Sequence, residues 1–331
     1  MKTPTSIILT LIFVVSFLSA QNVITVDRNP GAVAMFTNMT DAYAAAVDGD
    51  TILVAGSATI YGSLDCYKEL HFIGNGYMLG STGNDIPGVN RNATTLNIDF
   101  KENVSQGFGD SSNSSVTGMA GGFGSDAMVT GVVVDKCLNV TNQNWIFDGT
   151  VTITRCYFRN NLIRLNASGS SISNSRVSNL ELKQANTSAD HCIIGSTIQT
   201  VVGSSVSNTI FWFDKTSDMD ADGNFTYCVN IGPAGIVPAG IGNDTGVHLL
   251  SEFFVNPSED PTIDNYYMLK EGSPGSGTGQ GGADMGIFGG SKPYVLSGVP
   301  GIPRMTEFSV PAIATGLSAL EFEFSAQSFS E

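Results

Sequence analysis

Charged side chains are scarce in this sequence of 331 residues, and most of those present are acidic. There are 30 Asp and Glu against 15 Lys and Arg, giving a net charge of −15, and charged residues make up 14% of the chain. Because nucleic-acid-binding proteins concentrate positive charge, this balance argues against a nucleic acid partner. The low charge and the 38 glycines favour a β-rich extracellular protein with many tight turns.

Residues that usually carry chemistry are few or isolated. The three histidines, His71, His191 and His248, lie in unrelated segments, and the sequence has no Cys-x-x-Cys pair, so no zinc site is expected. The sequence also lacks the GxSxG motif, the glycine-rich phosphate loop and the HExxH motif. No complete set of catalytic residues can therefore be recognised.

Long apolar runs are missing except at the N-terminus. Lys2 precedes an apolar stretch at Ile7–Leu18, and Ser19 and Ala20 provide small residues for cleavage. This order is typical of a secretory signal peptide, and the run is too short to cross a bilayer comfortably. We therefore expect residues 1–20 to be a signal peptide and the protein to be secreted or on the cell surface, with no transmembrane segment.

A repeat organises the middle of the chain. Six segments align, and their starts are 19, 19, 17, 17 and 19 residues apart. Apolar and polar positions alternate within each segment, as expected for the strands of a solenoid whose turns stack about 4.8 Å apart. The segments are VVDKCLN (133–139), TITRCYF (152–158), SISNSRV (171–177), SADHCII (188–194), SVSNTIF (205–211) and NFTYCVN (224–230).

Equivalent positions of the six segments form columns along the predicted axis. The fifth position is small and should face the core, and it contains Cys137, Cys156, Cys192 and Cys228. We interpret these residues as a packed ladder and not as disulfides, because side chains on neighbouring turns run parallel. The fourth position interrupts the alternation and predicts a bend with a left-handed backbone. It is occupied by Lys136, Arg155, Asn174, His191, Asn208 and Tyr227.

The repeat resembles the right-handed parallel β-helix of secreted bacterial proteins of the pectate-lyase-like superfamily. A short helix expected at 40–47, followed by DGDTILV (48–54), resembles the N-terminal cap of such proteins. The pair LKEGSPGSGTG (269–279) and ADMGIFGG (283–290) resembles their closing turn. The resemblance implies an all-β fold, a right-handed parallel β-helix with a short capping helix. It implies no single function, because the superfamily includes lyases, hydrolases, adhesins and proteins without known activity.

These features divide the chain into the signal peptide at 1–20, a β-helix domain at 21–290 and a proline-containing linker with a short β tail at 291–331. In the tail, alternation at 306–310 and 319–325 predicts a β-pair or the start of a β-sandwich. Short apolar runs predict further strands of the domain at 128–132, 253–255 and 266–269.

One span is locally positive on this acidic protein. Between Val133 and Trp212 there are six basic residues and four acidic ones. Like charges on neighbouring turns repel unless an anion or a nearby acid compensates them. This span is therefore a candidate groove for an acidic uronate-containing or sulfated glycan, and ordinary solvated side chains are the alternative. The candidate binding residues are Lys136, Arg155, Arg159, Arg164, Arg176 and Lys183.

A catalytic form of this hypothesis is a polysaccharide lyase acting by β-elimination. In the β-helix lyases that the chain resembles, a cation neutralises the uronate carboxylate and an Arg or Lys base removes the C5 proton. Arg159, Arg164 and Lys183 are candidates for that role by position, without a matched motif. Those lyases usually carry a cluster of outward acids that binds Ca²⁺, and the basic span lacks one.

A possible Ca²⁺ loop lies at DMDADGN (218–224). Asp218, Asp220 and Asp222 before a glycine resemble the start of an EF-hand loop. Val229 stands where the bidentate Glu should be, which excludes a full EF-hand. A looser Ca²⁺ site and a plain acidic turn both remain open.

Three functions remain open from the sequence. The leading hypothesis is a secreted or cell-surface β-helix protein that binds carbohydrate without catalysis, since the sequence lacks a complete catalytic set. A polysaccharide lyase acting on an acidic glycan is the first alternative. A purely structural surface protein is the second.

Overall fold

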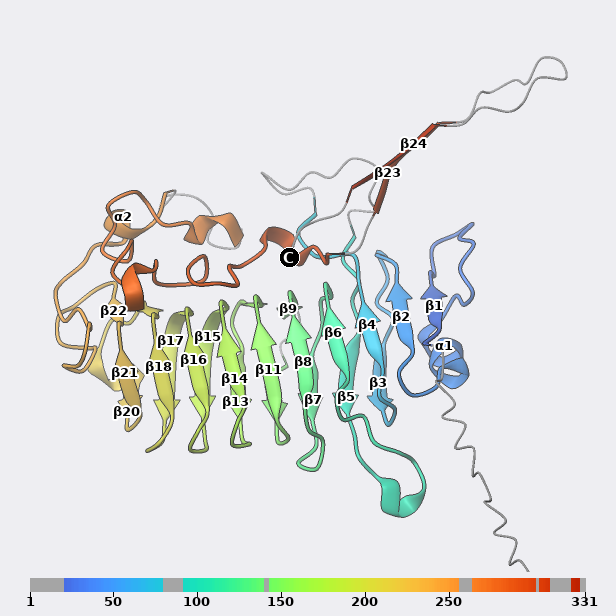
Figure 1. Cartoon of the computed structure of the whole chain (residues 1–331), viewed down its shortest axis with the longest axis horizontal. Helices are drawn as coiled ribbons and strands as arrows, with labels where there is room; N and C mark the ends of the chain where they lie inside the picture. Colours follow the sequence, from blue (N-terminus) through green and yellow to red (C-terminus); the bar gives the residue numbers. More distant parts are fainter. Residues whose placement is uncertain are drawn as a thin grey trace, which may run out of the picture.

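The structure is a computed structural model, and it describes residues 21–79, 92–139, 143–255, 264–301, 304–309 and 323–327. The predicted signal peptide at 1–20 lies outside the described residues. The chain coils into a solenoid in which each strand of the coil pairs in parallel with strands of the neighbouring turns (Figure 1). This arrangement confirms the predicted all-β parallel β-helix.

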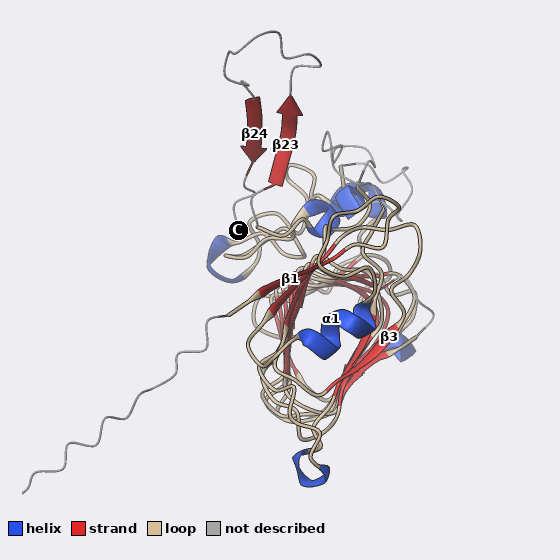
Figure 2. Cartoon of the chain, turned by 90° about the vertical axis from the view of Figure 1, so that its right-hand side faces the viewer, coloured by secondary structure: helices blue, strands red, loops and turns tan. Residues whose placement is uncertain are grey.

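Two parallel sheets form opposite walls of the coil (Figure 2). Sheet A contains, in spatial order, β1 (Val23–Val26), β2 (Thr51–Val54), β4 (His71–Ile73), β6 (Ser115–Thr117), β8 (Val132–Asp135), β11 (Val151–Thr154), β14 (Ser171–Ser173), β16 (Ser188–Asp190), β18 (Ser205–Ser207) and β21 (Asn224–Thr226). Sheet B contains β3 (Ser63–Cys66), β5 (Asn97–Phe100), β7 (Phe123–Ser125), β10 (Trp145–Phe147), β13 (Leu162–Leu165), β15 (Arg176–Leu182), β17 (Ile193–Thr200), β19 (Ile210–Phe211) and β22 (Val229–Asn230), with β9 (Leu138–Asn139), β12 (Tyr157–Phe158) and β20 (Met219–Ala221) beside this path.

The predicted register of the six repeats is confirmed residue by residue. Val133 pairs with Thr152, Thr152 with Ser171, and the ladder continues through the first residue of each later segment. The fourth position also has the predicted left-handed backbone at every repeat. Its φ angles are 52° at Lys136, 53° at Arg155, 46° at Asn174, 49° at His191, 48° at Asn208 and 53° at Tyr227.

Four of the five cysteines form the predicted ladder, and all five are buried free thiols. Because the fourth residue bends the chain, the N–H of the fifth residue points along the axis to the fifth side chain of the next turn. Cys137 N donates to Cys156 Sγ at 3.4 Å, Cys156 N to Ser175 Oγ at 3.0 Å, and Cys192 N to Thr209 Oγ1 at 3.3 Å. The column is therefore small and weakly polar because each side chain accepts a buried backbone N–H, which is costly to leave unpaired.

Each end of the coil is covered. Helix α1 (Met39–Ala45) crosses the open N-terminal end (Figure 2), and its Met39 and Ala42 join the core. The Asn38 side chain caps the helix by accepting a hydrogen bond from Asp41 N at 2.9 Å. At the other end, Ile236 and Val237 pack on the last turn. Both covers keep the sheet ends from exposing core side chains.

After β22 the chain turns back along the outside of the coil (Figure 1). The strands predicted at 253–255 and 266–269 are partly replaced by α2 (Leu250–Phe253) and the 3₁₀ turn η3 (Asp264–Tyr267), and what remains of them is an isolated antiparallel bridge between Phe254 and Leu269. Residues 264–301, here called the strap, also contain η4 (Gln280–Gly282) and η5 (Leu296–Gly298). The segments that resemble a closing turn therefore lie against earlier turns.

The strap follows the left-handed column back toward the N-terminus. Gly286 N donates to Asn208 O at 2.8 Å, and the Asn174 amide donates to Ile287 O at 3.1 Å and Gly289 O at 2.8 Å. Further on, Tyr77 N donates to Ser297 O at 2.7 Å. One continuous segment thus touches turns that are far apart in the coil.

A second buried apolar cluster explains why the strap lies there. The sixth position of the repeats faces outward but is mostly apolar, as at Leu138, Tyr157, Ile193, Ile210 and Val229. Strap residues cover this stripe and bury it. The covering side chains include Tyr266, Tyr267, Met285, Ile287 and Tyr294.

Beyond the strap, β23 (Arg304–Ser309) and β24 (Glu323–Gln327) form an antiparallel pair, which confirms a β-pair in the tail.

The strand predicted at 128–132 is wrong, because the chain turns at 127–128 and β8 begins at Val132. Two single 3₁₀ turns, η1 (Val104–Gln106) and η2 (Thr216–Asp218), lie in loops. Within the described ranges, no helix combines the length and apolar character that crossing a membrane requires.

Candidate functional site

The six candidate basic residues lie in different surroundings in the structure. Lys136 and Arg155 occupy the left-handed bends beside sheet A, and Lys136 is buried. The Arg155 guanidinium binds the Asp135 carboxylate of the preceding turn, with Nε–Oδ1 at 2.8 Å and Nη2–Oδ2 at 2.7 Å. Neither side chain presents a free positive charge to an approaching glycan.

Arg176 fastens the strap to the coil. Its guanidinium lies 5.8 Å from the ring centroid of Tyr157 and 5.9 Å from that of Tyr267, and Nε donates to the Tyr267 hydroxyl at 3.2 Å. Nη1 donates to the carbonyl oxygens of Phe158 and Arg159. These partners use the planar donor fork of arginine, so Arg176 has a structural role in this fold.

Arg164 and Lys183 lie together on the outer face of sheet B, around a shared acid. Arg164 Nε donates to Glu181 Oε2 at 2.5 Å, and Lys183 Nζ lies 3.4 Å from the same oxygen. The hydrogen bond from Arg164 to Glu181 raises the pKa of Arg164. A base must be deprotonated before it can take a proton, and this environment stabilises the charged guanidinium instead. Arg159 directly follows β12, and its backbone carbonyl accepts hydrogen bonds from Arg176 and Ser178.

The three aspartates of the predicted Ca²⁺ loop lie at the end of η2, in β20 and just after it. Asp220 pairs in the ladder with Gln199 of β17 and is exposed, as is Asp222, while Asp218 is half-buried. Among the residues that the structure describes, no group of three His, Cys, Asp or Glu side chains is placed to hold a metal ion.

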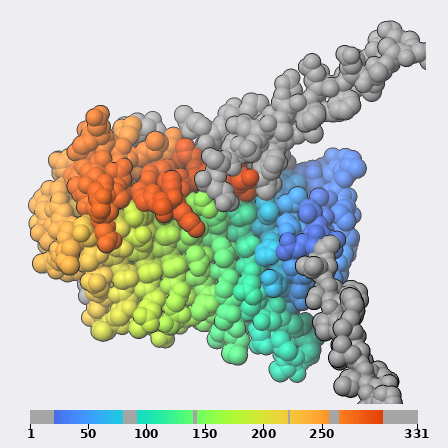
Figure 3. Space-filling model, in the orientation of Figure 1, coloured from blue at the N-terminus to red at the C-terminus, as the bar shows by residue number. Residues whose placement is uncertain are grey.

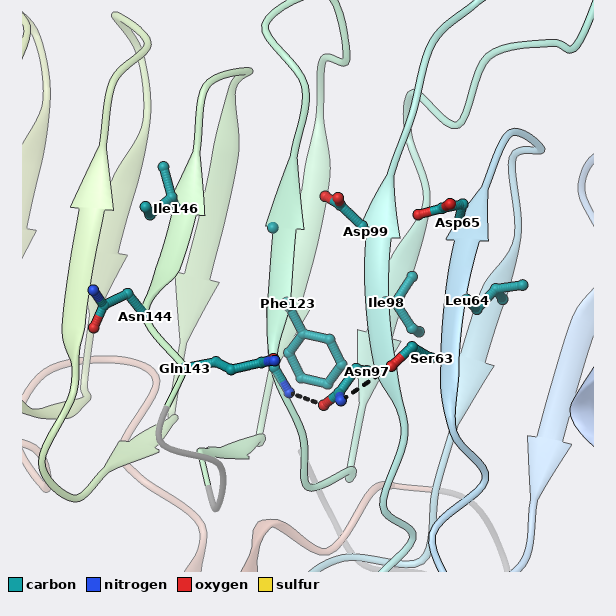
Figure 4. A pocket seen from close by; sticks show the side chains of 12 residues that line it. Ser63, Leu64, Asp65, Asn97, Ile98, Asp99, Phe123, Gln143, Asn144 and Ile146 are labelled. Carbon is teal, nitrogen blue, oxygen red and sulfur yellow. Dashed lines mark hydrogen bonds between the residues drawn. The ribbon is translucent and has the colours of Figure 1, made fainter.

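A different place on sheet B forms a hollow. Gly124 of β7 pairs in the ladder with Asp99 of β5, and Gly122 lies two residues earlier, while Phe123 between them points into the core. The face of β7 therefore carries no side chain at either position. The gap forms a hollow of about 360 Å³ over β3, β5, β7 and β10, at the N-terminal end of sheet B (Figure 4).

The glycine in the hollow cannot be replaced without crowding. A Cβ on Gly124 would lie 2.9 Å from the carbonyl oxygen of Ile146 and 3.4 Å from Asp99 Oδ1. The first of these distances is shorter than ordinary contact with backbone. The empty position thus depends on a residue without a side chain.

The walls of the hollow combine polar and apolar groups and come from four successive turns. Asn97 is fixed, because its Oδ1 accepts from Gly122 N at 2.7 Å and its Nδ2 donates to Ser63 Oγ at 3.3 Å (Figure 4). Ile146 contributes an apolar side chain on the β10 side. The polar residues that line the hollow are Ser63, Asp65, Asn97, Asp99, Gln143 and Asn144.

Sequence reasoning missed this site because it focused on charge and not on missing side chains. The signal was available in Gly122-Phe123-Gly124, where two glycines flank one core residue with the period of a strand. A glycine inside a strand often marks a close approach of another group. Recognising the gap also required the pairing of β7 with β5, which lies outside the regular repeats.

No protein-family model matches this sequence, and a comparison with curated proteins finds no similar sequence.

Proposed function

We propose that this protein binds carbohydrate, without catalysis, in the hollow on sheet B. The observation that carries the proposal is the gap over Gly122 and Gly124, bordered by carboxylate, amide and hydroxyl groups. Sugar hydroxyls both donate and accept hydrogen bonds, so they suit walls that offer both kinds of group. The neighbouring strands place these groups on a rigid sheet, which limits the ordering that binding would require.

The dimensions of the gap favour a ring-shaped ligand. β5 and β10 lie on either side of β7, so their backbones are about 10 Å apart at the usual strand spacing. The floor is glycine backbone, and Ile146 supplies one apolar surface against which a sugar ring can pack. The opening runs across several turns, so a glycan chain can extend beyond the hollow along the sheet (Figure 4).

The surroundings of the basic residues argue against the lyase alternative. Lys136 is buried, Arg155 pairs with Asp135, and Arg176 holds the strap. Arg164 and Lys183 share Glu181 and lie outside the hollow. The described residues around the hollow thus offer binding groups but no neutral arginine or lysine base.

The proposal is tested with a matched pair of glutamine variants. Gln143 is exposed at the hollow, and Gln199 is exposed on the same sheet at β17. Binding of a panel of neutral, acidic and amino glycans would be measured by titration calorimetry. We expect Gln143→Ala to weaken binding about fivefold, the effect of losing one hydrogen bond, and Gln199→Ala to leave affinity unchanged.

Two results would contradict the proposal. If no glycan of the panel binds the wild-type protein, the hollow is a surface feature of a purely structural protein. If a uronate glycan instead gains absorbance near 235 nm during incubation, which reports a new unsaturated sugar end, the protein is a lyase and the assignment without catalysis fails.

A further inference from the structure

The charge around the hollow differs from that expected for a site that binds acidic glycans. Asp65 and Asp99 line it, and none of the described lining residues is Lys or Arg. Asp65 of β3 pairs in the ladder with Asp99 of β5, so two carboxylates lie side by side on one face (Figure 4). Like charges placed directly opposite each other in a sheet are destabilising, and a cation bound between them would remove that repulsion.

A cation beside this pair, Lys101, is shared between two acids. Lys101 Nζ lies 2.5 Å from Asp99 Oδ2 and 3.2 Å from Asp126 Oδ1. Burial disfavours the Lys101 ammonium, but the hydrogen bonds and charges of Asp99 and Asp126 outweigh burial and raise its pKa. Lys101 therefore stays charged. Asp65, Asp99 and Asp126 together carry three negative charges, against this one positive charge.

Asp65 is the carboxylate left for a ligand. Its side chain is exposed, and no described residue forms an ion pair or side-chain hydrogen bond with its carboxylate. It lies at one side of the hollow, and the Asp99 carboxylate borders the empty position over Gly124. A ligand in the hollow would meet both acids at once.

We propose that the hollow selects glycans that carry free amino groups, with the ammonium of an amino sugar bound beside Asp65 and Asp99. This inference rests on the proposed carbohydrate-binding function and names its substrate class. The neutral walls at Asn97, Gln143 and Asn144 would bind the sugar hydroxyls, while the carboxylates bind the charged nitrogen. A uronate in the same place would add a third negative charge to the pair.

The experiment compares two glycans that differ only in that charge. Glucosamine oligomers and N-acetylglucosamine oligomers of equal length would be titrated into the mature wild-type protein at mildly acidic pH and low salt. We expect the glucosamine oligomer to bind about tenfold more tightly, as for a hydrogen bond to a charged group. We also expect added salt to reduce that preference, because ions screen an exposed pair.

Two aspartate variants place the preference at the hollow. Asp65→Asn should bring the two affinities together while the protein still binds the acetylated oligomer. Asp220→Asn is the matched control, because Asp220 is also an exposed aspartate on sheet B but lies near the opposite end of the coil. It should keep the full preference, and equal melting temperatures would show that both variants fold.

The outcomes separate this inference from the function on which it rests. Equal or weaker binding of the glucosamine oligomer by the wild-type protein overturns the inference and leaves carbohydrate binding intact. A preference that survives in Asp65→Asn, or disappears equally in Asp220→Asn, shows a general attraction to an acidic protein and also overturns it. Failure of both oligomers and of every other glycan overturns the proposed function as well.

Discussion

Arg155 and Asp135 form a two-pronged ion pair between adjacent turns of the coil, with donor–acceptor distances of 2.8 and 2.7 Å. Both side chains are mostly buried, with 11% and 15% of their surface exposed. Thr154 Oγ1 donates to the same carboxylate at 2.7 Å. Arg155 therefore compensates the negative charge of Asp135 at the end of β8. The ion pair also joins β8 to the bend after β11.

The first prediction concerns this ion pair. Arg155→Ala should lower the free energy of unfolding by about 1.5–3 kcal/mol, because charged hydrogen bonds are lost and Asp135 keeps its desolvated charge. Arg155→Lys should recover only part of this loss, since lysine lacks the planar fork. Urea unfolding would measure both values. Thr152→Ala, an exposed change on β11, is the control, and an equal loss there would contradict the assignment.

The second prediction separates backbone conformation from side-chain contacts at Asn174. Asn174 has a φ of 46° and donates to two strap carbonyls. Asn174→Gly loses those hydrogen bonds but keeps a residue suited to positive φ, whereas Asn174→Ala also places a Cβ in a left-handed conformation. We expect the alanine variant to be roughly 1 kcal/mol less stable than the glycine variant.

An extended position supplies the comparison for Asn174. Ser171 lies in β14 of the same turn, where alanine should be more stable than glycine because glycine loses more conformational freedom on folding. Thermal or urea unfolding of the four variants would measure the two differences. The same order at both positions would show that the left-handed backbone is not the cause.

The third prediction concerns pH and the buried Asp264. Burial raises the pKa of Asp264, although Ser297 N and the Tyr294 hydroxyl donate to its Oδ2. The folded state then holds the proton more tightly than the unfolded state, so this group contributes stability below the unfolded pKa of about 3.9 and loses it as pH rises through the folded pKa. Asp264→Asn removes that titration.

The measurement is the difference in unfolding free energy between wild type and Asp264→Asn across pH. It should shift in favour of the wild type as pH falls from neutral toward about 4. The difference cancels the titration of the other carboxylates, including Glu181 and Asp190, whose pKa values are lowered and which therefore act in the opposite direction. Asp222→Asn, a change at an exposed site, is the control. A shift of opposite sign would contradict the assignment of Asp264.

The fourth prediction concerns the five buried thiols. Burial raises the pKa of Cys66, Cys192 and Cys228 to about 12 in each case. Because the thiolate is the reactive form, the native protein should not react with a thiol reagent at pH 8, and all five thiols should react after unfolding in guanidinium. Rapid labelling of the native protein would show that the ladder opens locally.

The regular part of the fold could be read from the sequence because its signals are local and repeated. The fourth position of each repeat breaks the alternation of apolar and polar residues, and at 174 and 208 it is asparagine. Both features are visible in the sequence alone. The cysteine ladder followed from the same alignment.

The strap could not be predicted in the same way. Its contacts join residues far apart in the sequence, such as the hydroxyl groups of Tyr77 and Tyr294, which are 217 residues apart, and no periodic pattern encodes such a pairing. One clue was overlooked, because the sixth position is outward yet apolar at Ile193 and Ile210. An outward apolar stripe requires a cover. The hollow on sheet B depends on absent side chains, and its pairing partners lie outside the repeat.

The strap changes how the solenoid should come apart. A repeat protein whose turns touch only their neighbours can fray one turn at a time from either end. Here the backbone of Gly286 is hydrogen-bonded to that of Asn208, and the backbone of Ser297 is hydrogen-bonded to that of Tyr77, near the N-terminal end of the coil. The terminal turns cannot peel away independently without releasing the strap, so the coil should behave as a single cooperative unit. During synthesis, the early turns complete their outer packing only after the last part of the strap has left the ribosome.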